Sequence, residues 1–139
     1  PNIRTELQDA SACREEWKDS ADVVLCDVPC SGLGIIRKKP EIRFKNPDEI
    51  RTLPEIQARI LANCAQYVKK GGTLVYSTCT ILQRENEDVV RAFLTENPEF
   101  EAVSWTHPVC GERADGMVTL LPPVHNTDGF FIAKMHRKV

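Results

Sequence analysis

The chain has 139 residues, of which 42% are hydrophobic and 27% are charged, and its formal net charge is -2. This length suffices for one domain with a buried core, and the composition is ordinary for a globular protein. The small negative charge argues against a protein that binds nucleic acid over its whole surface. No apolar run approaches the roughly 18 residues of a membrane span, and the opening PNIRTELQDA lacks the basic and apolar regions of a signal peptide. We therefore expect a soluble, cytoplasmic protein.

The first half of the chain predicts a strand, a loop and a helix. Residues 22–27 form a short apolar run that ends in an acid, which is typical of a strand buried on both faces of a parallel sheet. Residues 31–47 are rich in Gly, Pro and basic residues and predict an irregular loop. Pro54 is suited to the first turn of a helix whose apolar residues recur up to Val68. Residues 69–72, Lys-Lys-Gly-Gly, predict the end of that helix.

The second half continues the alternation of strands and helices. Residues 73–78 predict a second buried strand, residues 89–94 an amphipathic helix closed by Asn97-Pro98, and residues 100–105 and 129–135 two strands that can pair. This order predicts an α/β fold with a mostly parallel, doubly wound sheet and an antiparallel edge. In such sheets ligands bind beyond the carboxyl ends of the strands.

Two of the six cysteines stand at these strand ends. Cys30 follows the first strand after Asp27, and Cys79 follows the second, so two thiols and a carboxylate should converge on the ligand side. Cys26 and Cys64 lie on apolar faces and are expected in the core. With no CxxC pair and no close group of Cys and His, the cysteines predict neither a disulfide framework nor a metal site.

Four segments resemble motifs of the Sun/Nop family of RNA (cytosine-5) methyltransferases, with the ribosomal RNA small-subunit type as the nearest. Residues 27–34, Asp-Val-Pro-Cys-Ser-Gly-Leu-Gly, resemble its Asp-x-Pro-Cys-Ser motif, and residues 76–80 resemble its Ser-Thr-Cys motif. Residues 85–87, Glu-Asn-Glu, and 128–131, Asp-Gly-Phe-Phe, resemble two later segments. Four residues between the motifs fit the family spacing: Arg37, Pro40, Gln57 and Leu61. The resemblance covers residues 8–135.

The resemblance implies a Rossmann-like fold that binds S-adenosylmethionine. Residues 1–139 would be the C-terminal half of the catalytic domain, because the family's Gly-rich cofactor loop lies upstream and no Gly precedes Asp22. Leu7-Gln8-Asp9-Ala10 resembles a motif in which an Asp, here Asp9, contacts the adenine of the cofactor. Asp27 would lie where cofactor and substrate meet, either on the edge of the cytosine or facing the cofactor's cation.

The resemblance also assigns the chemistry. Cys79 would add to carbon 6 of cytosine, which makes carbon 5 nucleophilic, and Cys30 would assist release of the enzyme as an acid or a base. The target base must leave its stack to reach such a site. Arg37, Lys38 and Lys39 follow the Pro-Cys motif and are expected to bind the phosphates of RNA. They belong to six basic residues between Arg37 and Arg51.

Three other classes account for part of this pattern. DNA cytosine-5 methyltransferases place their nucleophile in a Pro-Cys motif, which would make Cys30 the attacking thiol, whereas Thr78-Cys79 favours the RNA family. A fragment that binds RNA without catalysis is a second alternative, which cofactor binding would distinguish. A thiol hydrolase or redox protein would need a His near its nucleophile or a vicinal Cys pair. The three histidines all lie in the last third of the chain: His107, His125 and His136.

The expected lack of the cofactor loop has a consequence for the isolated chain. The strand at residues 23–26 would have a free backbone edge and apolar side chains, which invite pairing with another chain. We therefore expect the isolated 139 residues to self-associate, to bind S-adenosylmethionine weakly, and to be inactive.

Overall fold

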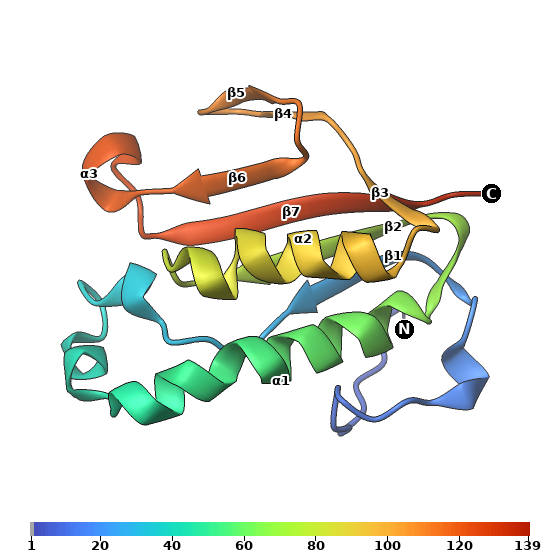
Figure 1. Cartoon of the computed structure of the whole chain (residues 1–139), viewed down its shortest axis with the longest axis horizontal. Helices are drawn as coiled ribbons and strands as arrows, with labels where there is room; N and C mark the ends of the chain where they lie inside the picture. Colours follow the sequence, from blue (N-terminus) through green and yellow to red (C-terminus); the bar gives the residue numbers. More distant parts are fainter. Residues whose placement is uncertain (1) are drawn as a thin grey trace.

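A computed structural model describes residues 2–139 as a mixed sheet covered on one face by two helices (Figure 1). The strand order is β1 (Ala21–Asp27), β2 (Val68–Thr78), β7 (Phe130–Arg137) and β3 (Phe100–Ala102), and β6 (Met117–Leu120) also pairs with β7. Strands β1 and β2 are parallel, and the pairings of β7 with β2, β3 and β6 are antiparallel. The predicted pairing of residues 100–102 with the last strand is confirmed.

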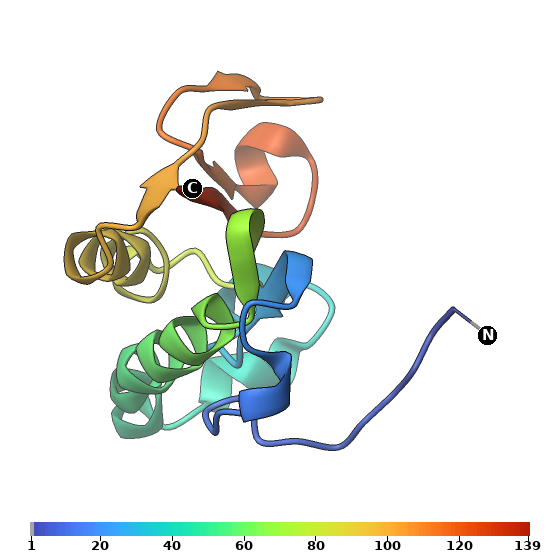
Figure 2. The same cartoon turned by 90° about the vertical axis from the view of Figure 1, so that its right-hand side faces the viewer.

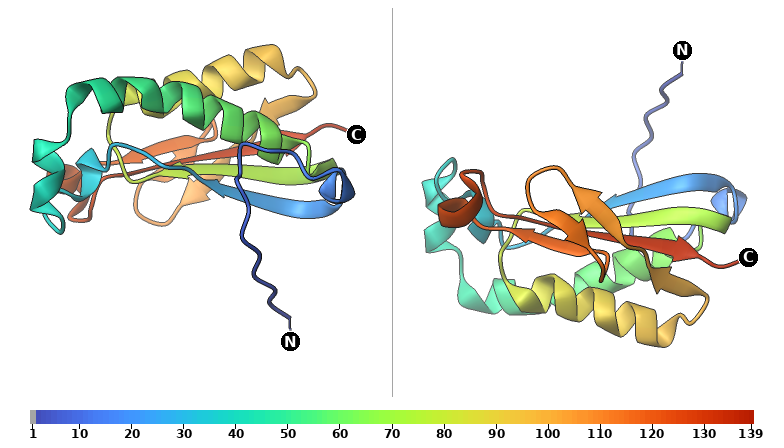
Figure 3. Two further views of the ribbon diagram at one scale, coloured as in Figure 1. Left: turned by 90° about the horizontal axis from the view of Figure 1, so that it is seen from below. Right: turned by 90° about the horizontal axis from the view of Figure 1, so that it is seen from above.

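Helices α1 (Pro47–Ala65) and α2 (Glu87–Glu96) lie side by side on the same face of the sheet (Figure 3). Their apolar sides meet the inward side chains of β2 and β7 in one core, which includes Leu61 from α1 and Val90 from α2. Tyr76 and Phe131 lie at its centre, fully buried, with their ring centroids 6.1 Å apart and their planes steeply tilted. This core fixes the position of the end of β1 relative to the end of β2.

The first helix begins earlier than Pro54, where the sequence predicted its first turn. Asn46 caps the helix, with its side-chain oxygen accepting a hydrogen bond from the Asp48 amide at 3.0 Å, and Pro47 occupies the first turn. Pro54 lies inside α1. Packing of the long apolar face against the sheet outweighs the loss of one backbone hydrogen bond at Pro54.

The helix also ends earlier than predicted, at Ala65, and residues 69–72 belong to β2. Their Lys-Lys-Gly-Gly sequence forms an irregularity in the strand pairing: the register shifts between Ala21 and Val23 of β1, and Gly71 has a φ of 76°. Residues 69–72 have no partner in the strand register: they form a bulge between Val68, which pairs with Ala21, and Thr73, which pairs with Val23 and His136.

The segment between α2 and β7 is more divided than the sequence predicted. The expected strand at residues 100–105 is split into β3 and β4 (Trp105–His107), and β4 pairs with β5 (Gly111–Arg113) in a separate two-stranded sheet. Strand β6 and the short α3 (Pro122–His125) were not anticipated. The expected irregular loop contains two 3-10 turns, η2 (Leu33–Ile35) and η3 (Pro40–Phe44).

Strand β1 forms one edge of the sheet, and the N-terminal residues leave the body of the molecule beside it (Figure 2). Val23 and Leu25 are 63% and 67% exposed, while Cys26 on the helix side is buried. The prediction of a strand buried on both faces is therefore wrong for residues 2–139, which cover only one face of β1. Within the same residues, no helix combines the length and apolar character needed to cross a membrane.

Candidate active site

The two motif loops leave neighbouring strands side by side. The parallel register pairs Asp27 with Ser77, and the Ser77 hydroxyl donates a hydrogen bond to Asp27 Oδ1 at 2.9 Å. One residue further, the Val28 amide donates to the Ser77 carbonyl at 3.2 Å. The strand pairing thus continues just far enough to place the residues after Asp27 beside those after Ser77.

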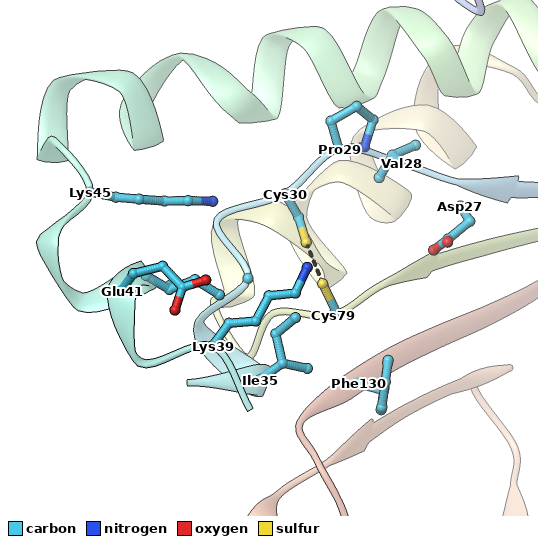
Figure 4. A pocket seen from close by; sticks show the side chains of 12 residues that line it. Asp27, Val28, Pro29, Cys30, Ile35, Lys39, Glu41, Lys45, Cys79 and Phe130 are labelled. Carbon is cyan, nitrogen blue, oxygen red and sulfur yellow. Dashed lines mark hydrogen bonds between the residues drawn. The ribbon is translucent and has the colours of Figure 1, made fainter. Parts of the chain in front are cut away.

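Cys30 and Cys79, the thiol pair, meet at this edge with their sulfur atoms 3.3 Å apart (Figure 4). Both side chains are half-buried, and both are free thiols. Burial, and then the contact with Cys79, raise the pKa of the Cys30 thiol far above its ordinary value. Either thiol can donate in this contact.

The thiol pair lines a pocket of about 490 Å³, a size typical of small-molecule sites. Asp27 and Phe130 also line it, as do two cations, Lys39 and Lys45, and the carboxylate of Glu41. Figure 4 shows the Lys39 ammonium directed toward the two sulfur atoms. Cations attract phosphate, so a pocket that combines two thiols with two lysines suits a site that acts on a nucleotide.

A buried carboxylate holds the loop that carries Cys30. Glu85, at the end of η4 (Gln83–Glu85), accepts hydrogen bonds on Oε2 from the Ser31 amide and from Gln57 Nε2, both at 2.9 Å. Gln57 Nε2 also donates to the Pro29 carbonyl at 2.9 Å. Gln57, Ser31 and Glu85 are fully buried. The residues on both sides of Cys30 are thus held from α1 and η4.

A second set of buried hydrogen bonds holds the loop that carries Cys79. The hydroxyls of Ser31 and Thr80 are 2.7 Å apart, which joins the two loops directly. Thr78 Oγ1 donates to Asn86 Oδ1 at 2.6 Å, and Asn86 Nδ2 donates to the Thr80 carbonyl at 3.0 Å. Asn86, at the start of α2, therefore holds the residues on both sides of Cys79.

Gly34 and Gly129 allow the loop before β7 to pack against the loops that carry Cys30 and Cys79. The Gly34 amide donates to the Cys79 carbonyl at 3.0 Å, and the Gly129 amide donates to the Gly34 carbonyl at 2.7 Å. A Cβ atom on Gly34 would collide with the Gly129 carbonyl and lie 2.8 Å from the Cys79 oxygen. A side chain at position 34 would therefore separate the loops that carry Cys30, Cys79 and Phe130.

The three basic residues expected to bind RNA have different surroundings. Lys38 Nζ lies 2.5 Å from Asp128 Oδ2, and Arg37 lies 3.4 Å from Oδ1 of the same carboxylate. Lys38, and more weakly Arg37, hold the pKa of the Asp128 carboxyl below its usual range, although its burial acts in the opposite direction. Lys39 instead lines the pocket.

The two carboxylates assigned to the cofactor are not brought together in one pocket. Asp27 lines the pocket of the thiol pair, whereas Asp9 lies in the exposed N-terminal segment and accepts hydrogen bonds from the Ser11 amide and hydroxyl at 2.9 and 2.7 Å. Across residues 2–139, no three His, Cys, Asp or Glu side chains are grouped so that they could hold a metal ion.

Comparison with known proteins identifies the family. Residues 2–136 match the family described as 16S rRNA methyltransferase RsmB/F. The chain belongs to this family. The resemblance drawn from the cysteine motifs is thereby confirmed, and the RsmB/F match spans the whole of residues 8–135, the segment that the resemblance covers.

Relatives of known type agree with this assignment. The chain is 43% identical over 143 residues to a protein of Bacillus subtilis named probable ribosomal RNA small subunit methyltransferase B, covering 98% of this chain and 32% of that protein. It is 40% identical over 122 residues to ribosomal RNA small subunit methyltransferase B of Thermus thermophilus, covering 86% and 30%. The chain thus spans about a third of the length of these curated relatives.

Solved structures share the fold. NSun6 from Pyrococcus horikoshii, determined with SFG, superposes with a TM-score of 0.80 at 26% identity, covering 98% of this chain and 35% of that chain. A methyltransferase homologue from the same organism superposes with a TM-score of 0.68 at 30% identity, covering 85% and 39%. The mixed sheet and its two helices are therefore part of the α/β methyltransferase fold that the sequence predicted.

Sequence reasoning gave no role to several residues that shape this RsmB/F site. Gln57 was recognised only as matching the family spacing, and Glu85 only as part of a segment that resembles a later family motif. Lys45, whose ammonium donates to the Ser31 carbonyl at 2.9 Å, was counted only among the basic residues. One signal in the sequence was available: a Gln on the apolar face of a helix and a Glu before an amphipathic helix are polar residues in positions that the fold buries.

Proposed function

We propose that this chain carries the thiol chemistry of an enzyme that methylates carbon 5 of cytosine in RNA, with ribosomal RNA of the small subunit as substrate and S-adenosylmethionine as methyl donor. The observation that carries the proposal is the thiol pair: Cys30 and Cys79 lie 3.3 Å apart, at adjacent strand ends and in a pocket that also contains Asp27. Membership in the RsmB/F family and the names of the relatives support RNA as the substrate.

Cys79 is the proposed nucleophile. Its sulfur adds to carbon 6 of the cytosine, which turns the ring into an enamine with a nucleophilic carbon 5. The Cys30 S–H donates its hydrogen bond to the Cys79 sulfur and lowers the cost of the negative charge there. After methyl transfer, water or another base takes the proton from carbon 5, and the electron pair of that C–H bond re-forms the ring double bond and expels the Cys79 thiolate from carbon 6. Cys30 then stabilises the departing thiolate, a role that requires a thiol that remains protonated.

The high pKa of Cys30 supports this division of roles. A thiol that keeps its proton is a poor nucleophile and a suitable hydrogen-bond donor or acid. In the DNA-type arrangement Cys30 would attack instead, and the adduct test below separates the two arrangements. Gln57 and Glu85 hold the Cys30 loop, and Asn86 holds the Cys79 loop. Such support favours precise placement of the two sulfur atoms, which catalysis requires and RNA binding alone does not.

The residues present fit one side of S-adenosylmethionine. The Asp27 carboxylate opens on the pocket beside the thiol pair, with only Oδ1 engaged by Ser77, and suits a cationic sulfonium or the exocyclic amine of cytosine. Asp9 is proposed for the adenine. When bound, the cofactor supplies an electrophilic methyl group. SFG, present in the Pyrococcus NSun6 structure, is an analogue of this cofactor, which supports the choice.

RNA would approach along the basic segment, residues 37–39. Lys39 lies at the pocket and is proposed to bind a phosphate of the target nucleotide, while Arg37 and Lys38 bind flanking phosphates at the expense of their contacts with Asp128. Binding of RNA without catalysis is the second function that the same surface permits, and the test below separates it from methylation.

The test uses the chain itself and a chimera in which it replaces the matching segment of the Bacillus subtilis relative. With unmodified small-subunit RNA and labelled S-adenosylmethionine, the chimera is expected to form 5-methylcytidine. Cys79→Ser should abolish the product and retain RNA binding. Cys30→Ala should accumulate a covalent protein–RNA adduct, visible as a shifted band on a denaturing gel.

Cys64→Ala is the matched control, because this half-buried thiol packs against the core and away from the pocket. It should leave both product and adduct unchanged. Accumulation of the adduct by Cys79→Ala in place of Cys30→Ala would reverse the two roles. A chimera that binds RNA tightly and forms no 5-methylcytidine, while the Bacillus protein does, would favour the binding function.

A further inference from the structure

The two sulfur atoms of the thiol pair lie close enough for a reaction other than methyl transfer. The sulfur atoms of Cys30 and Cys79 are 3.3 Å apart although 49 residues separate the two cysteines. A disulfide bond is about 2.0 Å long, so the sulfurs need to approach by roughly 1.3 Å. Both thiols line the open pocket, which gives small reagents access to them. A small movement of either side chain would therefore bring the two sulfur atoms within bonding distance.

We propose that Cys30 and Cys79 form a site of reversible oxidative modification, in which a peroxide-class oxidant converts the pair to an intrachain disulfide. The Cys79 sulfur attacks one peroxide oxygen and becomes a sulfenic acid, and the other oxygen leaves as water. The Cys30 sulfur then attacks the Cys79 sulfur, the hydroxyl group leaves, and the Cys30 proton completes a second water. Two thiols lose two electrons, and one peroxide gains them.

Held loops favour this bond over any other pairing of the cysteines. The residues before and after Cys30 are hydrogen-bonded to Gln57 and Glu85, and the Cys79 carbonyl accepts the Gly34 amide. Closing the disulfide therefore orders little additional chain. In an unfolded chain the same closure would cost several kcal/mol of entropy, which the fold has already overcome.

Access to two adjacent sulfur atoms sets Cys30 and Cys79 apart from the remaining cysteines. Cys26 is 3% exposed and faces Cys64 in the core, where a peroxide has no open route to it. Cys13 lies in the exposed N-terminal segment, and Cys110 follows β4 in the separate hairpin. The pocket of the thiol pair, by contrast, is open to small reagents and is lined by two sulfur atoms 3.3 Å apart.

Formation of the disulfide would consume both groups required by the proposed function, so the methylation proposed above would stop until a thiol reductant restored the pair. The inference itself does not rest on that function. It concerns two thiols and an oxidant, and the following experiment contains neither RNA nor S-adenosylmethionine. Its failure would leave the methylation proposal standing.

The experiment treats the full chain with dilute hydrogen peroxide, blocks the remaining thiols with iodoacetamide, and maps the tryptic peptides by mass spectrometry. Cleavage after Lys and Arg places Cys30 in peptide 19–37, Cys79 in peptide 71–84 and Cys64 in peptide 60–69. The expected product links peptides 19–37 and 71–84, with loss of Cys79 alkylation and recovery of it after dithiothreitol.

Variants separate the two cysteines of peptide 19–37. Cys26→Ala should leave the link unchanged, and Cys30→Ala should abolish it and leave Cys79 to oxidise further to the sulfinic acid, which dithiothreitol does not reverse. Where Cys30→Ala folds poorly, Cys30→Ser and the circular dichroism of the variant serve the same comparison. A link that persists in Cys30→Ala, or oxidation of Cys13 and Cys110 while the pair stays alkylatable, would overturn the proposal.

Discussion

Gln57 provides a direct test of how the Cys30 loop is held. Its side-chain amide donates to the Glu85 carboxylate and to the Pro29 carbonyl, both at 2.9 Å, from a fully buried position on α1. Within residues 2–139, Oε1 of Glu85 has no hydrogen-bonding partner, so the carboxylate depends on the two donors at Oε2. Gln57→Ala removes one of these two donors and, among residues 2–139, the only side-chain hydrogen bond to Pro29.

The expected cost follows from the groups involved. A hydrogen bond to a charged group contributes about 1.5–3 kcal/mol and a neutral one about 0.5–1.5 kcal/mol, so Gln57→Ala should lower the free energy of unfolding by roughly 2–4 kcal/mol. This is a large share of the roughly 5–15 kcal/mol that stabilises a domain. Urea denaturation followed by circular dichroism measures it, with the slope m as a check on two-state behaviour.

Gln66→Ala is the matched control. Gln66 is an exposed glutamine at the end of the same helix, and its truncation should change stability by less than about 0.5 kcal/mol. In the variant Gln57→Ala, the peroxide-induced link between Cys30 and Cys79 should also form more slowly, because the loop is no longer held. Equal stability of the two glutamine variants, or an unchanged rate of linkage, would refute the role assigned to Gln57.

Four further outcomes are expected. Burial and the Cys79 contact raise the pKa of Cys30 to about 12. The rate of Cys30 alkylation in the folded chain should therefore keep rising above about pH 10, where the rate in the urea-unfolded chain no longer increases. Equal pH profiles of the two rates would contradict this. Lys38 lowers the pKa of Asp128, so their pairing should stabilise the protein above about pH 4 and fade as the pH falls through the lowered pKa; the urea midpoints of wild type and Asp128→Asn should therefore converge in acid. Neutral substitution of residues 37–39 should reduce the slope of log affinity for RNA against log salt by about 0.7–0.9 per lost phosphate contact, and an unchanged slope would mean that these side chains are only solvated. The isolated chain should self-associate on size-exclusion chromatography and bind S-adenosylmethionine weakly by calorimetry. Leu25→Lys on the exposed face of β1 should favour the monomer. Micromolar cofactor affinity in a clean monomer would contradict the expectation.

Much of the fold was predictable because its signals are local. The apolar runs that became β1 and the second half of β2, and the periodic apolar residues of α1 and α2, depend on neighbours within a few positions. The errors occurred where a distant partner prevailed. Pro54 was compatible with a helix start, yet packing against the sheet extended the helix back to Pro47, and residues 69–72 became a bulge of β2 because Val68 and Thr73 on either side of them pair with β1. Such competition is invisible in a window of ten residues.

The sequence by itself determined that Cys30 and Cys79 follow strands, and the parallel order of those strands determined that both face the same edge. Tertiary structure alone decided that their sulfur atoms touch, that Lys39 turns into the pocket while Lys38 pairs with Asp128, and that Asp9 lies elsewhere. The reason is physical: a strand end places a residue to within a few ångströms, whereas a hydrogen bond or a sulfur contact is decided by fractions of one. This sub-ångström precision comes from buried side chains that are distant in sequence, such as Gln57 and Glu85, which hold the residues on both sides of Cys30.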